Sequence, residues 1–403
     1  MTAIPLESSR LHRALSTRAA GIPGARDSAF FELLNLAATR EGVIKLGMGE
    51  PDIPTPRHIV EAAKSALDGG QTTYTNPAGM PELREAIAEK LARDNGLSYD
   101  PAEEIIVTTG AQEALAVVMQ TMLDPGDEVI IASPYYAAYA GNILLAGGVP
   151  VPVPTHEADD FQLSAADVEA RITDRTKLLA IITPSNPTAS ALTRETQESL
   201  ARVAIDHDLP VLSDELYEKV VYDGFEHVSI ASFAGMRERT IVVNGFSKAY
   251  SMTGFRVGYM AGPADYIQSA LEPRHCFSIS SPTPFQHAAL AALTGPQDHF
   301  GPMMEEYTRR RNATAAVFDE LGVTYSMPRG AFYFWANVSG AGIPSYDFCR
   351  RAVVDHAILF FPGSMYGNEG EGYARISFLA PPAQLDEALE RFARLYRECQ
   401  SAA

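Results

Sequence analysis

Short apolar runs alternate with segments of helical periodicity between about residues 100 and 260. The runs lack polar alternation, which indicates strands that are buried on both faces of a sheet. Most of the segments between them, such as AQEALAVVMQTML and TRETQESLARVAIDH, are apolar at every third or fourth position, as amphipathic helices are. We therefore expect an α/β fold with a mainly parallel sheet. Its strands are expected at EEIIVTTG, DEVIIAS, TKLLAIIT, LPVLSDE, TIVVNGF and VGYMAG.

The pattern changes after about residue 300, where helices and strands no longer alternate regularly. The predicted order is a helix at EEYTRRRNATAAVFDELG, a strand or hairpin at GAFYFWANV, a helix at SYDFCRRAVVDH, strands at ILFFPG and ARISFLA, and a terminal helix at AQLDEALERFARLYREC. This order predicts a smaller α+β domain. The predicted division is an N-terminal arm and part of the small domain over 1–60, a large domain over 61–300, and the small C-terminal domain over 301–403.

Composition narrows the range of functions. The chain has 403 residues and a formal net charge of −18, which argues against nucleic acid or an anionic membrane surface as a partner. No apolar run reaches transmembrane length, and the first residues do not resemble a signal peptide. The three cysteines lack ligand spacing and are expected to be unpaired thiols in a reducing cytoplasm. His156 and Asp159 share a polar loop, but no metal site is predicted there.

Polar motifs follow the predicted strands. Parallel sheets bind ligands at the carboxyl ends of their strands, and TTGAQ, SPYY, PSNPT, SDELY and GFSK all fall at such ends. The last motif places Lys248 directly after an apolar run, with Arg256 eight residues later among aromatic and glycine residues. Lysine and arginine are almost never fully buried without partners. We therefore expect these two cations to face a ligand, a surface position being the alternative.

Lys248 is the first candidate catalytic residue. A lysine held in a site by other groups loses its proton readily and can form a Schiff base with a carbonyl. Pyridoxal phosphate needs such a lysine, an acid at its pyridinium nitrogen and a cradle for its phosphate. Asp214 ends an apolar strand and could supply the acid, or could simply cap the next helix. Tyr217 could direct a phenol at the ring oxygen of the cofactor, or could be a packing residue.

The phosphate cradle is expected between a predicted strand and a predicted helix. Free backbone N–H groups at the start of a helix bind anions, although a glycine turn of this kind is common in parallel-sheet proteins. Tyr136 could stack on the cofactor ring or could pack in the interior. The candidate residues for the phosphate are Gly110, Ala111, Gln112, Ser247 and Arg256.

Two further residues suit the carboxylate of a substrate. Asn186 has an amide that could reach both a cofactor oxygen and a substrate carboxylate, the alternative being an Asn-Pro turn. Arg375 stands in an otherwise apolar strand and requires a partner. A bidentate pair with an α-carboxylate would provide one, as would an internal salt bridge.

The motifs and their order resemble the fold-type-I pyridoxal-phosphate enzymes, specifically the class I and II aminotransferases related to aspartate aminotransferase. The resemblance covers about residue 20 to the C-terminus and rests on LGMGEPDIPTP, YTNPAGMPELREA, TTGAQEAL, SPYY, SNPT, SDELY, SKAYSMTGFRVGY and ARISF. It implies that the large domain binds pyridoxal phosphate. The implied activity moves an amino group between an L-amino acid and a 2-oxo acid by a ping-pong mechanism.

The resemblance also implies residue roles. Lys248 would carry the cofactor and shuttle a proton, and Asp214 would hold the pyridinium. Tyr74 is expected to reach the phosphate of a neighbouring subunit, so a homodimer with shared active sites is implied. The remaining implied contacts are Tyr217 and Asn186 at the ring oxygen, Ala111, Gln112, Ser247 and Arg256 at the phosphate, Tyr136 on the ring face, and Gly49, Asn186 and Arg375 at the substrate α-carboxylate.

The chain departs from the family pattern in three places. Ala189 replaces a usual glycine after SNPT, and Gly245 stands where many relatives carry a hydroxyl. SISSPTPFQ lacks the arginine that binds a distal carboxylate in relatives specific for aspartate, so a dicarboxylate-specific site is not expected. Arg26, Arg274 and His275 remain possible contacts to the substrate side chain.

The sequence leaves the amino donor and acceptor open, and it also leaves other functions open. A pyridoxal-phosphate lyase, decarboxylase or oxidative deaminase of the same fold, acting on an amino acid in biosynthesis, is the principal alternative. A cofactor-binding regulator would carry an added DNA-binding domain. A nicotinamide dehydrogenase is a third alternative, but GMG at residues 47–49 is a lone GxG without the full dinucleotide fingerprint.

Overall fold

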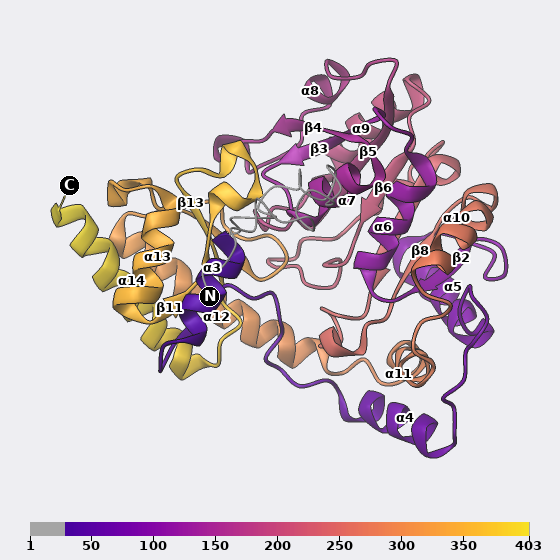
Figure 1. The fold of residues 1–403 in the computed structure, drawn as a ribbon, viewed down its shortest axis with the longest axis horizontal. Coiled ribbons are helices and arrows are strands. Elements are labelled where there is room, and N and C mark those ends of the chain that lie inside the picture. Colours follow the sequence, from indigo (N-terminus) through magenta and orange to yellow (C-terminus); the bar gives the residue numbers. More distant parts are fainter. Residues whose placement is uncertain (1–28, 403) are drawn as a thin grey trace, which may run out of the picture.

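The computed structural model describes residues 29–402 (Figure 1). Over this range a seven-stranded sheet has the order β2-β8-β7-β6-β5-β3-β4. Neighbouring strands are parallel except for β8, which runs antiparallel to β2 and β7. The mainly parallel sheet is thus confirmed. The strands are β2 (Ile105–Thr108), β3 (Glu128–Ser133), β4 (Val149–Pro154), β5 (Thr176–Ile182), β6 (Val211–Asp214), β7 (Thr240–Gly245) and β8 (Gly258–Ala261).

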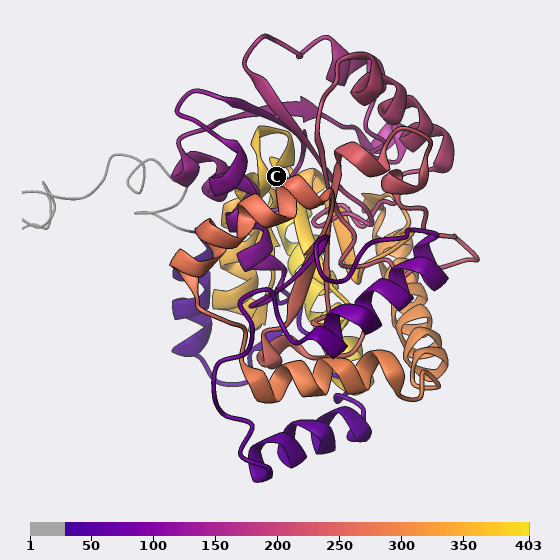
Figure 2. The ribbon, with the colours of Figure 1, turned by 90° about the vertical axis from the view of Figure 1, so that its right-hand side faces the viewer.

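Helices cover both faces of this sheet, because its strands are apolar at consecutive positions. Ile106 and Met260 pack with one group of helices, whereas the adjacent Ile105 and Tyr259 pack with another. The first face carries α6 (Ala111–Met122), α7 (Ala138–Ala146) and α10 (Ala264–Phe277). The opposite face carries α4 (Arg57–Asp68), α5 (Pro81–Asn95), α8 (Ala165–Glu169), α9 (Arg194–Asp206) and α11 (Thr283–Thr294). Figures 1 and 2 both show α4 beside α11.

A second group of elements lies on the left of Figure 1, around a separate four-stranded sheet of order β12-β13-β10-β9. The predicted C-terminal helices and strands all occur in it. A short parallel pair of β1 with β11 joins it to the N-terminal part of the chain. The elements are α3 (Ala29–Ala38), β1 (Ile44–Lys45), α12 (Phe300–Leu321), β9 (Thr324–Tyr325), β10 (Tyr333–Asn337), α13 (Ser345–His356), β11 (Ile358–Leu359), β12 (Phe361–Pro362), β13 (Tyr373–Ser377) and α14 (Pro382–Ala402).

The N-terminal elements α3 and β1 pack against this second group. Helix α3 contacts α13, and β1 completes the pair with β11. The domain boundaries themselves stay a prediction. Among residues 29–402, no helix combines the length and the apolar character needed to span a bilayer. Short 3₁₀ turns complete the described chain: η2 (Glu157–Asp159), η3 (Ile230–Ser232), η4 (Arg237–Arg239), η5 (Thr253–Phe255), η6 (Ser339–Ala341), η7 (Gly363–Tyr366) and η8 (Asn368–Gly370).

Candidate active site

A cavity of about 440 Å³ lies where the carboxyl ends of the large-sheet strands meet β10, β13 and the segment Gly47–Glu50. The cavity brings together most of the residues that the sequence singles out. Those that line it are Gly49, Ala111, Gln112, Tyr136, Asn186, Asp214, Tyr217, Ser247, Lys248, Arg256 and Arg375. Gly110 lies directly beside it, because a side chain there would meet the Arg256 guanidinium.

Lys248 lies in the loop that joins the antiparallel strands β7 and β8. Its Nζ donates a hydrogen bond to the Gly49 carbonyl and lies 5.8 Å from the centre of the Phe332 ring. Burial, together with the nearby charges of Arg375 and Arg256, lowers the pKa of Lys248 to about 8. The amine is therefore much closer to losing its proton at neutral pH than an exposed lysine is.

Asp214 is the last residue of β6, and its side chain contacts α7. Its Oδ2 accepts a hydrogen bond from the Tyr139 hydroxyl at 2.9 Å, and its Oδ1 accepts one from the Leu216 N–H at 3.2 Å. Burial raises the pKa of Asp214 to about 6, while the bond from Tyr139 opposes that rise. The carboxylate is thus buried and held in one orientation. It can still accept a hydrogen bond from a further N–H or O–H group.

Two phenols extend this wall. The hydroxyls of Tyr217 and Tyr333 are 3.2 Å apart, and burial raises the pKa of Tyr217 well above its ordinary value. The sequence did not single out Tyr333 or Tyr139. Tyr333 lies in the apolar strand β10, and Tyr139 lies in α7 among small and aliphatic residues, so both read as packing positions.

Arg375 is a buried cation without an acidic partner in the described part of the chain. Its Nη1 donates to the Asn186 Oδ1 at 2.8 Å and its Nη2 donates to the Gly47 carbonyl at 2.7 Å. Its Nε is buried and has no hydrogen-bond partner among the described residues, and no carboxylate in residues 29–402 forms an ion pair with it. A guanidinium that is 7% exposed and lacks an anion indicates a place for an anionic ligand.

A second cationic position lies at the start of α6. Gly110 has φ +76°, and a Cβ added to it would lie 2.5 Å from Nη2 of Arg256. A Cβ on Gly258 would lie 2.6 Å from the backbone nitrogen of Ala111. Both glycines therefore allow the loop of Arg256 and the N-terminus of α6 to approach closely. Free backbone N–H groups and a guanidinium together suit a phosphate.

The departures from the family pattern have local physical accounts. Ala189 is buried and adopts φ 57°, the left-handed conformation that glycine adopts without a steric penalty, so the turn after Asn186 carries some strain. A Cβ on Gly245 would lie 3.1 Å from the Cα of Gly258. Close packing of β7 against β8 therefore favours glycine at this position.

Some proposed contacts lie elsewhere. Tyr74 does not line the cavity and is 74% exposed, and His275 is also exposed and outside the lining. Arg274 is fully buried, where it donates to the carbonyls of Ile279 and Val107, so it does not reach the cavity. Arg26 lies outside the described residues. Glu50 lines the cavity and was not predicted.

The fold and this site define a class of enzyme. Residues 41–392 match the family of class I and II aminotransferases, and the chain belongs to that family. It is an aminotransferase with the fold of the type I enzymes.

Individual relatives agree with this assignment. The chain is 41% identical to "Aromatic-amino-acid aminotransferase 2" of Thermococcus litoralis, covering 91% of this chain and 95% of that protein. It is 42% identical to an aspartate aminotransferase of Pyrococcus abyssi, with the same two coverages. Among solved structures, aspartate aminotransferase from Thermus thermophilus with maleate superposes with a TM-score of 0.89 at 39% identity, covering 95% of this chain and all of that one.

Proposed function

We propose that this chain uses pyridoxal phosphate to transfer an amino group from an L-amino acid to a 2-oxo acid. The observation that carries the proposal is the grouping in one cavity of Lys248, Asp214 and Arg375, an arginine that pairs with no carboxylate of residues 29–402. The residues fit the cofactor in three respects. A lysine of lowered pKa is available for a Schiff base, a buried carboxylate faces the same cavity, and a cationic N-terminal cradle is present at Gly110.

Each part of the cofactor has residues of matching chemistry. Lys248 would hold the aldehyde carbon, Asp214 the pyridinium nitrogen, and Tyr217 with Asn186 the ring oxygen. Tyr136 would stack on the ring. The phosphate would be held by Gly110, Ala111, Gln112, Ser247 and Arg256, with Tyr74 of a second subunit. When bound, the cofactor supplies an electron sink that allows the α-proton of the amino acid to leave.

The side chains around this sink have separate tasks. Arg375 and Asn186 would bind the α-carboxylate, together with the backbone of Gly49, and so orient the Cα–H bond. Lys248 would take the proton from Cα as a neutral amine and deliver it to the former aldehyde carbon of the cofactor, C4′. A pKa of about 8 suits this role, because a general base works best when its pKa lies near the operating pH.

The substrate side chain is proposed to be neutral. The lysine and arginine side chains among the described residues that line the cavity are Lys248, Arg256 and Arg375, and each has a task above. Phe30 and Met48 line the same cavity, as does the acidic Glu50. A distal carboxylate would find no further cation among these described lining residues. We expect aromatic or aliphatic donors to react faster than aspartate in half-reactions followed by absorbance.

Assembly and location are proposed on the same basis. Tyr74 is largely exposed and does not line its own cavity, which agrees with a role in the site of a second subunit. The chain is therefore proposed to be a homodimer with shared active sites. Its described cysteines Cys276, Cys349 and Cys399 are unpaired, which supports a cytoplasmic protein.

Replacement of Lys248 by alanine tests the function directly. The purified parent should show the visible absorbance of lysine-bound pyridoxal phosphate, and Lys248→Ala should lose that band and nearly all transamination. Lys64→Ala is the matched control, because Lys64 is exposed on α4. Undiminished transamination by Lys248→Ala would contradict the proposal, and ammonia release from the parent without an acceptor would favour the lyase alternative.

A further inference from the structure

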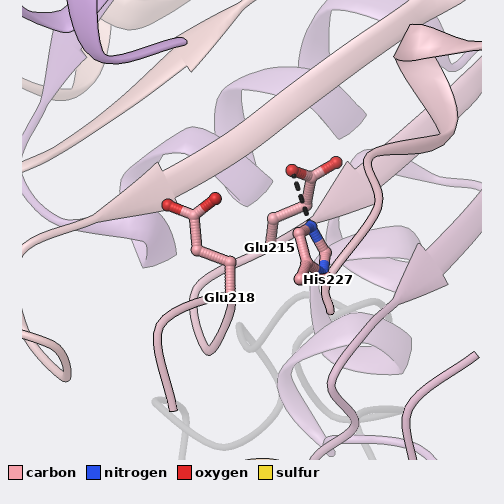
Figure 3. Close-up of side chains that lie close together, drawn as sticks. All are labelled: Glu215, Glu218 and His227. Carbon is pink, nitrogen blue, oxygen red and sulfur yellow. Dashed lines mark hydrogen bonds and ion pairs between the residues drawn. The ribbon is translucent and has the colours of Figure 1, made fainter. Parts of the chain in front are cut away.

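The side chains of the segment Asp214–Glu218 lie on two sides of the chain. Asp214 and Tyr217 line the cavity, whereas Glu215 and Glu218 do not and instead join a buried polar group behind it. Figure 3 shows both glutamates leaving the same bend of the chain, with the His227 ring against Glu215. We name this group the rear polar cluster. It consists of Lys90, Ser213, Glu215, Glu218, His227 and Ser229.

Glu215 is fully buried and held by three partners. Its Oε1 accepts hydrogen bonds from the hydroxyls of Ser213 at 2.8 Å and Ser229 at 2.5 Å, and its Oε2 lies 3.1 Å from Nε2 of His227. Its backbone N–H donates to the Val243 carbonyl on β7. These hydrogen bonds fix the direction of the Glu215 carboxylate.

Glu218 has its own cation. Lys90 donates a hydrogen bond to its carboxylate, the amide of Asn95 donates another at 2.7 Å, and the side chains of Lys90 and Glu218 are nearly buried. Lys90 thus already neutralises Glu218, and we assign no metal ion to the cluster. Among the described residues no lysine or arginine pairs with Glu215, so its charge is not neutralised by a permanent cation.

We propose that Glu215 is a positioning residue for Asp214: it anchors the segment that carries Asp214 and places a negative charge behind that carboxylate, which strengthens its hold on a proton of the bound ring. This inference rests on the proposed function. Replacing buried ionic groups by apolar ones is often neutral or stabilising. The cluster is therefore better explained by the arrangement of the site than by stability.

The electrostatic surroundings agree. Burial is the main cause that raises the pKa of Asp214, and the Glu215 charge acts in the same direction, while Tyr139 and Lys248 act against it. The other titratable groups near Glu215 are His227, Tyr99, Tyr259 and Glu218, whose carboxylate lies within 4.8 Å of that of Glu215 and pairs with Lys90. Loss of the Glu215 charge should make Asp214 a weaker base without removing any group from the cavity.

Glu215→Gln tests the proposal, because it keeps the shape and removes the charge. The first measurement uses the full-length chain freed of cofactor. The difference in thermal midpoint between each protein and its Asp214→Asn version, followed from pH 4 to 8, reports the titration of Asp214. We expect Glu215→Gln to move that titration down by about one pH unit. In the holoenzyme we expect kcat to fall roughly tenfold with KM changed less than about twofold.

The controls separate this role from a structural one. Glu226 lies next to His227 in the sequence but is exposed, so Glu226→Gln removes a nearby charge outside the cluster and should change neither readout. If Glu215→Gln fails to fold, Glu215→Met replaces it, because it also removes the charge and has a similar length. It should shift the Asp214 titration in the same direction as Glu215→Gln does.

The outcomes are distinguishable. A lowered thermal midpoint with an unchanged Asp214 titration and unchanged kcat would overturn the inference and leave Glu215 a packing residue. An Asp214→Asn holoenzyme with full activity would instead overturn the proposed role of Asp214, and with it the function on which the inference rests.

Discussion

Arg375 gives the most quantitative test of the site. Its two terminal nitrogens now donate to Asn186 and Gly47, and an α-carboxylate would add charge-assisted bonds worth about 1.5–3 kcal/mol each. Arg375→Lys keeps the charge but loses one of two parallel bonds, which lowers kcat/KM by roughly 10- to 150-fold. Arg375→Met loses both, which lowers kcat/KM by roughly 10²- to 10⁴-fold.

Replacing Arg375 should cost less stability than breaking an ordinary buried ion pair. Because Arg375 has no acidic partner among the described residues, Arg375→Met leaves no carboxylate unpaired. It does lose the contact of the guanidinium with the Tyr333 ring, 4.4 Å away, so the cofactor-free chain should lose about 1–2 kcal/mol of unfolding free energy. Arg310 is the matched control, since it is equally buried but pairs with Asp52 at 2.8 Å and Glu306 at 2.7 Å. Arg310→Met should cost about 3–5 kcal/mol.

The assay combines steady-state kinetics on one amino donor with thermal unfolding of the same preparations. Unchanged kcat/KM in Arg375→Lys would refute a bidentate role for this arginine. Equal losses of stability in Arg375→Met and Arg310→Met would refute the argument that the cavity holds an unpaired charge.

Two other outcomes follow from the geometry. The pKa of Lys248 lies at about 8 in the folded chain against 10.5 unfolded, so the charged amine costs stability below pH 8, and that cost disappears as pH rises to about 10.5. The free energy of unfolding of cofactor-free Lys248→Met should therefore exceed that of its parent by up to about 3 kcal/mol at pH 7, and the difference should vanish by pH 10.5. Urea unfolding measures both values, and a difference that stays constant with pH would contradict the prediction. Gly258→Ala should weaken cofactor binding at least about tenfold in a fluorescence titration, because the new Cβ would displace the start of α6. Gly301→Ala is the control: a Cβ there meets no atom within 4 Å, so this variant should bind the cofactor normally.

The large sheet was predictable because its strands are apolar at consecutive positions and end in polar motifs. Strand β4 was not predicted, since its sequence VPVPVP contains three prolines, and proline lacks the N–H that a central strand needs. It lies at the edge of the sheet, where this loss is tolerated. The direction of β8 also has no signal in its four residues, because direction depends on which neighbour the chain meets.

The site was predictable where chemistry and a strand end coincide, as at Asp214 and Lys248. Tyr139 and Glu215 were not predictable from the sequence. A phenol in an apolar helix and a second acid after Asp214 acquire meaning only from residues that are distant in the sequence, here Asp214 for Tyr139 and Ser229 for Glu215.

The pairing of β1 with β11 has a consequence for synthesis of the enzyme. Ile44 pairs with Ile358, more than 300 residues later, and Gly47 just beyond this pair receives a hydrogen bond from Arg375. Synthesis proceeds at roughly 5–20 residues per second, so about 15–60 s pass between the synthesis of the N-terminal wall of the cavity and that of the residues it contacts. A nascent chain can thus form the lysine-bearing loop well before it can bind a substrate carboxylate, and a chain truncated before Arg375 should be unable to bind one.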